Sequence, residues 1–148
     1  MHETFEFLIA ELRPRLARAF VAAYGLERGQ EALAESMGYA WEHFDQVRSM
    51  VNPGGYLYRV GQSRTRERSQ PDFPLPRTVG LPDIEPGLAQ ALLALSERQR
   101  TCVALVHCYG YTHDEVADLL GLSRSSIQSH VERGLAHLRH SLGASDHA

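Results

Sequence analysis

The stretch from Leu95 to Leu142 carries the helix start and stop signals of a helix-turn-helix, and it constrains the fold more than any other part of the chain. Thr112 is a good N-cap, and Glu115, three residues later, can complete a capping box. Gly121 would end this short helix where a left-handed backbone costs little. Ser123 can cap a second helix, whose apolar residues recur every three or four positions as one inward stripe. The stripe consists of Ile127, Val131, Leu135, Leu138 and Leu142. Two helices joined by a tight turn are therefore predicted.

The residues that should face outward at the start of the second helix are short polar groups and guanidinium forks. They are Arg124, Ser125, Ser126, Gln128, Ser129, His130 and Arg133. Such side chains read base edges and hold phosphates when a recognition helix enters the major groove. Polar residues also face water on any amphipathic surface helix, which is the alternative for these positions alone. The capped helix, the Gly-x-Ser turn and the longer helix together favour DNA binding, because a constellation is more specific than single residues.

Six short runs in this stretch carry a family pattern. They are Leu95-Ser96-Glu97-Arg98-Gln99-Arg100, Gly110-Tyr111-Thr112, Glu115-Val116-Ala117, Leu120-Gly121-Leu122-Ser123, Ser129-His130-Val131 and Arg133-Gly134-Leu135. This pattern resembles region 4 of bacterial sigma factors, above all those of the extracytoplasmic-function group. In that family region 4 binds the promoter element near position −35 and touches the flap of the polymerase β subunit, so the resemblance implies both roles. Gln128 stands where the family often has a basic residue, and the Glu132 carboxylate suits a cytosine amino group but repels phosphate.

Composition and charge limit the classes of function. A chain of 148 residues is long enough for one ordinary domain or two small helical ones. The formal net charge is −3, so any contact with DNA must come from local patches. No apolar run approaches the roughly 20 residues of a membrane span, and Met1-His2-Glu3 begins no signal peptide. We therefore expect a cytoplasmic protein with no membrane partner.

No set of residues predicts catalysis or a bound cofactor. The chain has no glycine-rich phosphate loop and no Ser or Cys with an arranged base. Cys102 and Cys108, with His107 and His113 nearby, raise the question of zinc. A six-residue offset on one helix rotates by about 600°, so the two thiols would lie on different faces and would not converge on a metal. We assign no catalytic residue, no metal and no cofactor, and interpret both cysteines as small buried apolar residues.

The N-terminal part should begin with two helices. Residues 3 to 24 carry a helical apolar stripe, which Pro14 should kink or break and Gly25 should end. A second helix should run from about Gly29 to Val47. The residues expected on its inner face are Leu33, Met37, Trp41 and Phe44.

The second helix also carries an acidic outer face, which predicts either solvent or a basic partner. The run Gly29-Gln30-Glu31-Ala32-Leu33-Ala34-Glu35-Ser36-Met37, followed by Ala40-Trp41, resembles the segment of sigma region 2 that docks on the coiled coil of the polymerase β′ subunit. In the family an Asp, a Gln and a Glu lead that contact. Here Glu31 replaces the Asp, Ala34 stands at the Gln, and Glu35 matches the Glu. The resemblance implies that Glu31 and Glu35 bind the polymerase.

A third helix should begin at Asn52-Pro53, and its mixture of Arg and Tyr is typical of single-stranded DNA binding. From Pro53 to Gln70 there are four Arg and one Glu, a local charge of +3 in a chain of −3. Unpaired bases stack on aromatic rings and guanidinium planes, while cations follow the backbone. The alternative is that Leu57 and one of the two tyrosines belong to the core and the arginines only close a surface helix.

Within this helix, Leu57-Tyr58-Arg59-Val60 resembles part of the Trp-Leu-Tyr-Arg-Ile-Ala-Arg-Asn segment of sigma factors. That segment recognises and opens the promoter element near −10. Tyr56 replaces the Trp, and Gly61-Gln62-Ser63 replaces Ala-Arg-Asn. The residues implied in opening the promoter are Tyr56, Tyr58, Arg59, Gln62, Ser63, Arg64 and Arg66.

Five of the seven prolines fall between Ser69 and Gly87, which predicts an extended linker able to hold two small domains apart. A short helix should follow from Leu88 to Leu95. We therefore expect an all-α protein: a three-helix domain similar to sigma region 2 over residues 1–70, a Pro-rich linker over 71–84, and a region 4-like helix-turn-helix domain over 85–148.

The expected function is that of a sigma factor, which binds core RNA polymerase and promoter DNA and can be held by an anti-sigma factor. Two alternatives remain open. One is a stand-alone helix-turn-helix regulator of duplex DNA. The other is a degenerate sigma-like protein that binds polymerase or a regulator without melting DNA.

Overall fold

The computed structural model describes residues 2–67 and 86–146, and these residues form helices without any strand. The helices are α1 (His2–Tyr24), α2 (Leu26–Glu42), α3 (Phe44–Arg48), α4 (Pro53–Glu67), α5 (Pro86–Ala94), α6 (Glu97–Val103), the π-helical segment η1 (Ala104–Cys108), α7 (His113–Leu120) and α8 (Arg124–Asp146). The expected all-α fold is confirmed. The predicted linker, 71–84, lies outside the described residues.

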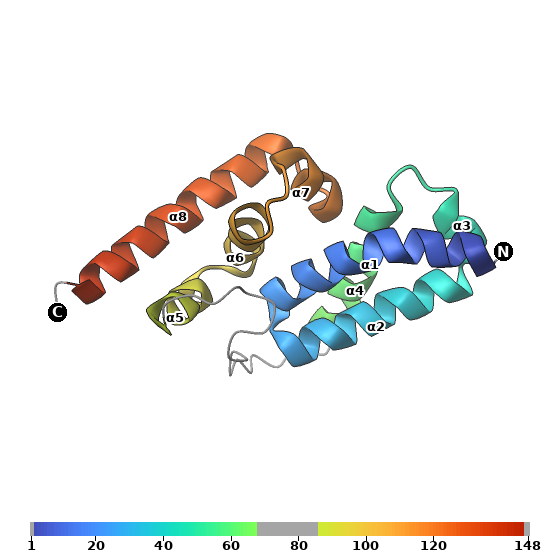
Figure 1. Ribbon diagram of the computed structural model, residues 1–148, viewed down its shortest axis with the longest axis horizontal. Helices are drawn as coiled ribbons and strands as arrows, with labels where there is room; N and C mark the ends of the chain where they lie inside the picture. Colours follow the sequence, from blue (N-terminus) through green and yellow to red (C-terminus); the bar gives the residue numbers. More distant parts are fainter. Residues whose placement is uncertain (1, 68–85, 147–148) are drawn as a thin grey trace.

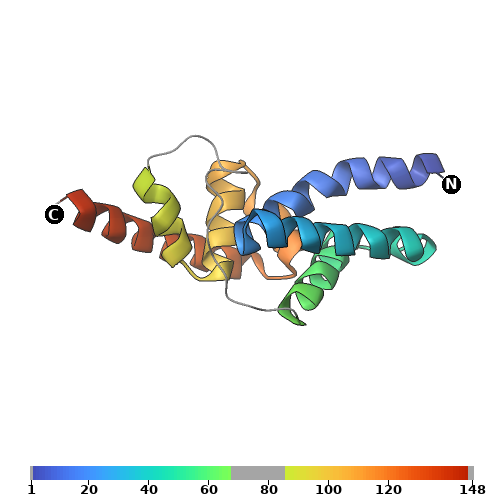
Figure 2. The ribbon, with the colours of Figure 1, turned by 90° about the horizontal axis from the view of Figure 1, so that it is seen from below.

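The helices form two groups, here called the N-terminal half (α1 to α4) and the C-terminal half (α5 to α8) (Figure 1). The two chain ends lie at opposite ends of an elongated molecule, and α8 runs from the contact with the other half out to the C-terminus. Seen from below, α1 and α2 extend away from the C-terminal half toward the N-terminus (Figure 2).

In the N-terminal half, α1 and α2 form a tight antiparallel pair. Gly25 makes the turn with φ 86°, a conformation that favours glycine. A Cβ at Gly29 would lie 2.8 Å from the Cα of Val21, so glycine lets the two backbones meet. A kink or a break was expected at Pro14, and α1 continues through Pro14 without a break. Pro14 and Ala10 are both exposed, so water can bond to the Ala10 carbonyl that lacks its helical donor.

The second predicted helix is divided into two. It ends at Glu42, and a short helix, α3, restarts at Phe44 after a turn at His43. Trp41, which was expected inside, lies in the last turn of α2 before this break and is 56% exposed, while its neighbour Ala40 is fully buried. Phe44 and Leu33 are buried as predicted. The three-to-four-residue spacing therefore located Leu33 and Phe44 on the inner face but misplaced Trp41, and it did not reveal the break at His43.

In the C-terminal half, the short helix predicted over Leu88 to Leu95 is present as α5, and it packs on α8 around a second, smaller core. The buried members of that core are Ala91, Leu92, Leu95, Val103 and Leu138. Ser96 starts α6 with a capping box completed by Gln99. The helix then loosens into the π-helical η1, where the N–H of Tyr109 reaches the Ala104 carbonyl at 3.1 Å.

The main core runs across both halves. Leu16 and Phe20 of α1 and Leu57 of α4 belong to the same cluster of buried residues as Leu105 and Val116 of the C-terminal half. The linker had suggested two small domains without a fixed interface, but in this structure the halves are packed together. The domain boundaries remain a prediction.

Candidate nucleic-acid interface

The first helix of the helix-turn-helix, α7, is fixed at both ends by the residues that the sequence indicated. The N–H of Glu115 donates to the Thr112 hydroxyl, and the N–H of Thr112 donates to the Glu115 carboxylate, both at 3.1 Å. The bond from the Thr112 backbone holds the pKa of the Glu115 carboxyl below its usual range. Gly121 ends the helix with φ 69° and ψ 35°. The capping box and the glycine stop are confirmed.

The second helix, α8, presents all the side chains expected to read the −35 element. The Ser123 hydroxyl caps it by accepting the N–H of Ser126 at 3.1 Å. Ile127 and Val131 are buried beneath it, so the opposite face is open to solvent. The exposed residues there are Arg124, Ser125, Gln128 and Arg133, and the partly exposed ones are Ser126, Ser129 and His130. The structure thus gathers the seven predicted residues on the first three turns of one helix.

The charges on this face are only loosely paired. Arg124 Nε lies 3.7 Å from a carboxylate oxygen of Asp114, and both side chains are largely exposed. Such a surface pair contributes little to stability, so the guanidinium is free to exchange its partner for a phosphate. Gln128 Nε2 donates to the Glu132 carboxylate at 3.2 Å. Within residues 2–67 and 86–146, Glu132 forms no ion pair, and its negative charge stays on the face expected to meet DNA.

The positive charges of two arginines act on His130, and sequence reasoning missed one of them, Arg98. Partial burial lowers the pKa of the His130 imidazole, and the positive charges of Arg98 and Arg133 lower it further. Arg98 comes from α6, about thirty residues earlier in the chain, and its side chain is exposed. Its place in the Ser96-Glu97-Arg98 run gave no sign that α6 packs beside α8, so only the fold could reveal it.

On α4, the structure separates the two tyrosines expected to stack on bases. Tyr58 lies in the core, only 3% exposed, with its ring stacked on Phe20 at a centroid distance of 5.0 Å. Burial strongly raises the pKa of its hydroxyl. Tyr58 therefore drops out of the DNA-facing set, which is the alternative that the sequence had left open for one of the pair.

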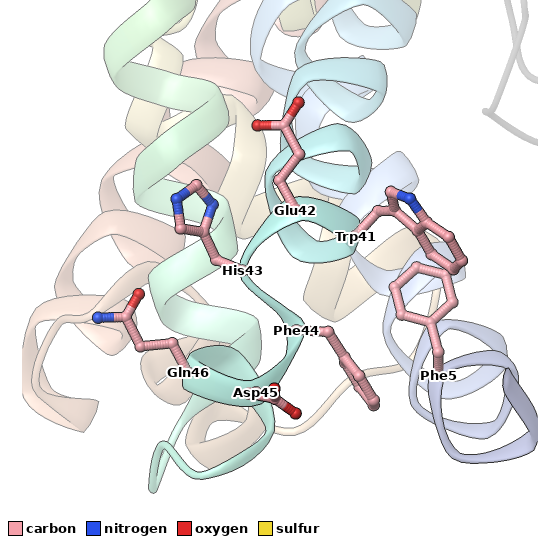
Figure 3. A pocket seen from close by; sticks show the side chains of 7 residues that line it. All are labelled: Phe5, Trp41, Glu42, His43, Phe44, Asp45 and Gln46. Atoms are coloured by element: carbon pink, nitrogen blue, oxygen red, sulfur yellow. The ribbon is translucent and has the colours of Figure 1, made fainter. Parts of the chain in front are cut away.

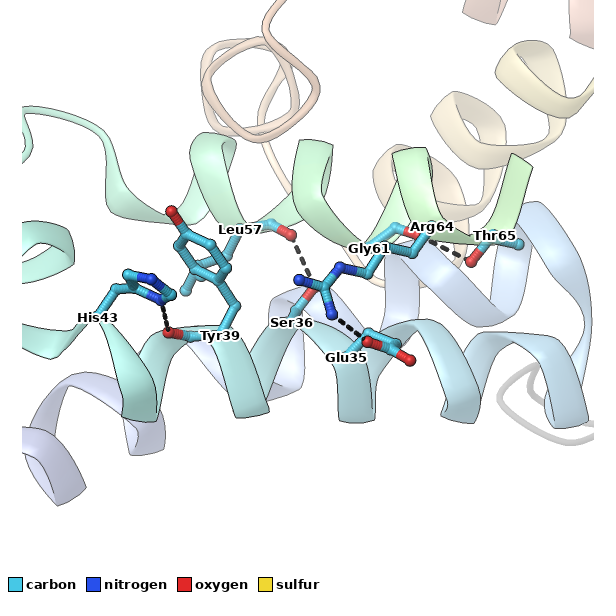
Figure 4. Close-up of polar contacts among 8 residues, drawn as sticks. All are labelled: Glu35, Ser36, Tyr39, His43, Leu57, Gly61, Arg64 and Thr65. Carbon is cyan, nitrogen blue, oxygen red and sulfur yellow. Dashed lines mark hydrogen bonds and ion pairs between the residues drawn. The ribbon is translucent and has the colours of Figure 1, made fainter. Parts of the chain in front are cut away.

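Tyr56 is half-buried and forms part of a surface aromatic cluster. Its hydroxyl lies 3.0 Å from that of Tyr39, and this hydrogen bond raises the pKa of Tyr39. The Tyr39 ring in turn stacks on His43, with centroids 4.1 Å apart (Figure 4). Tyr39 and His43 come from the end of α2 and had no sequence signal as site residues. Together with Tyr56 they form a group of three neighbouring rings at a surface where only Tyr56 was expected.

The remaining residues of the expected −10 set differ in their environment. Arg59 and Ser63 are exposed and Gln62 is half-buried. Arg64 is engaged in an ion pair with Glu35 across the α2–α4 groove (Figure 4). Arg66 lies among the α4 residues whose side chains fall outside the described part of the structure.

A buried hydrogen bond joins α2 to α4 beneath this surface. The Ser36 hydroxyl of α2 donates to the Leu57 carbonyl of α4 at 2.7 Å, while Thr65 donates within α4 to the Gly61 carbonyl at 2.8 Å (Figure 4). Of the two carboxylates expected to bind polymerase, Glu31 is exposed and Glu35 is partly buried by its ion pair. Both carboxylates thus lie on the surface of α2, but Glu35 is already paired with Arg64 of the same chain.

A pocket of about 380 Å³ lies at the far end of the N-terminal half (Figure 3). Its aromatic wall is formed by Phe5, which contacts Trp41 and Phe44 edge to face at centroid distances of 4.9 and 5.2 Å. Glu42 and Asp45 add carboxylates at the rim.

In the part of the chain that the structure describes, no cluster of three or more His, Cys, Asp or Glu side chains could hold a metal. Nor is any described helix long and apolar enough to cross a membrane.

These features define an all-helical protein with a capped helix-turn-helix and an open recognition helix. Residues 87–138 match the family model of sigma-70, region 4. Over 57 residues the chain is 37% identical to the RNA polymerase sigma factor SigO of Bacillus subtilis (strain 168). That match covers 38% of this chain and 32% of the relative, so the chain spans about a third of the length of the curated relative it matches.

Two solved structures share the fold over nearly the whole chain. One is the sigma factor RpoE of Bartonella quintana in complex with the anti-sigma factor NepR, with a TM-score of 0.68, 18% identity, and coverage of 95% of this chain and 98% of that one. The other is CnrH in complex with the cytosolic domain of CnrY, with a TM-score of 0.63, 23% identity, and coverage of 97% and 90%. Residues 87–138 therefore match sigma-70 region 4, and the chain shares the fold of these two solved structures.

Proposed function

We propose that this protein is a sigma factor that binds core RNA polymerase and directs promoter-specific transcription initiation in the cytoplasm. The observation that carries the proposal is the exposed start of α8, where base-reading and phosphate-binding side chains stand on a domain that matches sigma region 4. The C-terminal half would bind the −35 element and the flap of the polymerase β subunit. The role is not enzymatic, since the polymerase supplies the chemistry.

The N-terminal half would supply the second DNA contact and the main contact with polymerase. Tyr56, with Tyr39 and His43 beside it, offers rings for unpaired bases near −10, and Arg59 offers a cation for the backbone. Glu31 and Glu35 would meet the β′ coiled coil. Because Glu35 is paired with Arg64 in the free chain, docking there requires that this ion pair rearrange.

A protein regulator is the further partner that the solved relatives suggest. RpoE of Bartonella quintana was solved with an anti-sigma factor, and CnrH with a cytosolic domain of CnrY. By analogy, we expect an anti-sigma protein to hold this chain inactive until a signal releases it.

The test is reconstitution with bacterial core RNA polymerase and the DNA upstream of the protein's own operon. We expect comigration with core and one defined transcript. Arg133→Ala should weaken promoter binding by about 1–3 kcal/mol, whereas Arg139→Ala, which changes an exposed arginine farther along α8, should not. A chain that fails to bind core yet binds a specific duplex would instead be a stand-alone helix-turn-helix regulator.

The burial of Tyr58 favours one second candidate, a sigma-like protein that binds polymerase without opening DNA. With Tyr58 in the core, the described residues of α4 carry one ring for stacking rather than two. A fluorescent base analogue placed in the −10 element of a duplex promoter separates the two candidates. Its emission rises on strand opening by a working sigma factor and stays constant if the protein only binds.

A further inference from the structure

Gln128 and Glu132 form a hydrogen-bonded pair on the exposed face of the recognition helix, α8. Gln128 Nε2 donates to Glu132 Oε1 at 3.2 Å, across one helical turn. Both residues are exposed, whereas their neighbours Ile127 and Val131 are buried in the core. The pair therefore lies on the side of α8 that would enter the major groove, one and two turns beyond Arg124.

This bond fixes the orientation of the Gln128 amide. A carboxylate only accepts hydrogen bonds, so the amide nitrogen, and not the amide oxygen, must face Glu132. Within residues 2–67 and 86–146, no donor reaches Gln128 Oε1 or the second carboxylate oxygen of Glu132. The pair thus presents two open acceptor oxygens, against a single amide N–H that stays free.

Stability gives little reason for a carboxylate at this place. Water competes for the Gln128–Glu132 bond because both side chains are exposed, and a pair at this spacing stabilises a helix only slightly. A negative charge on a face that meets DNA is also repelled by every phosphate nearby. Such a charge is favourable only where a base donates to it, so its effect is to distinguish one DNA sequence from another.

The four bases differ in what they present to these acceptors in the major groove. Guanine presents N7 and O6, and thymine presents O4, and all three atoms are acceptors that a carboxylate repels. Adenine presents its N6 amino group beside the N7 acceptor. Cytosine presents only the N4 amino group, so it alone offers Glu132 a donor without an adjacent lone pair. Opposite the other bases the carboxylate would lose water without a full replacement, which is costly.

We propose that Gln128 and Glu132 act as one reading unit that selects a cytosine in the duplex element bound by α8. Glu132 accepts from the cytosine N4 amino group, and Gln128 is a positioning residue that holds the carboxylate in place. The unit works mainly by penalising guanine and thymine at that position. This inference deepens the proposed function and rests on it in one respect, that α8 enters the major groove of DNA.

A duplex library with a randomised element tests the reading unit in the full-length chain. The library is selected once with the chain alone and once with the chain bound to core RNA polymerase, and the bound duplexes are sequenced. Glu132→Ala removes the carboxylate, and Gln128→Ala removes the group that holds it. Arg139→Ala, at an exposed site farther along α8, is the control. Circular dichroism checks that each variant keeps its helices.

A double variant that exchanges the two residues is the sharpest test. Gln128→Glu combined with Glu132→Gln keeps the composition, the net charge and the spacing for a hydrogen bond. It moves the carboxylate by one helical turn, about 5.4 Å, which is more than the roughly 3.4 Å between base pairs. The preferred cytosine should therefore move to a different position of the element.

We expect the native chain and the control to prefer cytosine over thymine by at least about fivefold at one position. Glu132→Ala should reduce this preference to within about twofold, and Gln128→Ala should lower it by at least about twofold. Because Gln128 acts through Glu132, the double alanine variant should lose no more of the preference than Glu132→Ala alone.

Several results would overturn the reading unit. These are a native chain without a cytosine preference, a preference that Glu132→Ala leaves intact, and one that stays at the same position in the exchange variant. A full preference in Gln128→Ala overturns the positioning role. If the chain alone selects a duplex with this cytosine but does not bind core polymerase, the proposed function fails while the reading unit stands. Selection of no sequence in either experiment overturns both.

Discussion

Arg100 of the C-terminal half caps the end of α1 in the N-terminal half: its Nη2 donates to the Ala23 carbonyl at 2.6 Å. Nε donates to the Ala22 carbonyl at 2.7 Å, and Nη1 to Leu95 at 3.0 Å. Arg100 is 7% exposed, and burial lowers the pKa of its guanidinium. A cation at the negative end of a helix is favourable, and three bonds compensate for its lost hydration. One side chain thus bonds to two carbonyls of the other half, in addition to the shared core.

Replacing Arg100 should therefore be costly. Arg100→Ala leaves three carbonyls without their donor and removes a buried cation, and we expect a loss of roughly 3 kcal/mol in the free energy of unfolding. Arg100→Lys keeps the charge but loses the planar guanidinium, so its free energy of unfolding should lie between those of the native chain and Arg100→Ala. Urea denaturation followed by circular dichroism measures both. Arg139→Ala, at an exposed position, is the control and should change stability by less than about 0.5 kcal/mol. Equal stability of Arg100→Ala and the control would contradict the capping role.

Gly61 lies where α4 crosses α1 and α2. A Cβ there would lie 2.4 Å from Phe20 Cζ, 2.6 Å from the Ser36 hydroxyl oxygen and 2.9 Å from the Ala32 carbonyl oxygen. We expect Gly61→Ala to lower the free energy of unfolding by about 1–3 kcal/mol through overpacking. Gly38→Ala, at an exposed site of α2 with nothing within 4 Å, should raise it by up to about 1 kcal/mol. Thermal melting of the two variants measures whether each is less or more stable than the native chain. A stabilised Gly61→Ala would show that α4 is not tightly packed.

Most of what the sequence predicted depends on neighbours close in the chain. The cap at Thr112, the stop at Gly121 and the start of α4 at Pro53 are decided within a few residues, and they appear as expected. Tyr58 and Trp41 depend on how helices cross. An arginine-rich helix gives no local sign that Tyr58 meets Phe20, and the spacing within α2 gives none that Trp41 lies at the surface against Phe5 of α1. Contacts between halves, such as that of Arg100 with α1, join residues more than seventy positions apart.

Glu132 should restrict which DNA the recognition helix accepts. Its carboxylate accepts from Gln128 and has no cation within the described residues, so it repels phosphates and suits a base with an exposed amino group. On the proposed function, Glu132→Gln should bind random duplex DNA more tightly and reduce the discrimination between promoter and random DNA by about 1 kcal/mol. Fluorescence anisotropy with both duplexes at one salt concentration measures this. Glu42→Gln removes a carboxylate from an exposed site on α2 and should leave the ratio unchanged. If Glu132→Gln also leaves it unchanged, Glu132 only faces solvent.

His130 should make the folded chain less stable on mild acidification. Its folded pKa is lowered, first by burial and then by Arg98 and Arg133, so the unfolded chain takes up a proton at a higher pH than the folded chain does. The stability contributed by neutral His130 is therefore complete above the ordinary pKa of 6.5 and is lost as the pH falls from there toward the lowered value. Urea denaturation at pH 7.5 and at pH 5.5 measures the loss. His130→Gln should lose less stability between these two pH values than the native chain. His107→Gln, which replaces an exposed histidine on η1, should lose as much as the native chain. Equal losses in all three would show that His130 is hydrated and remote from both arginines.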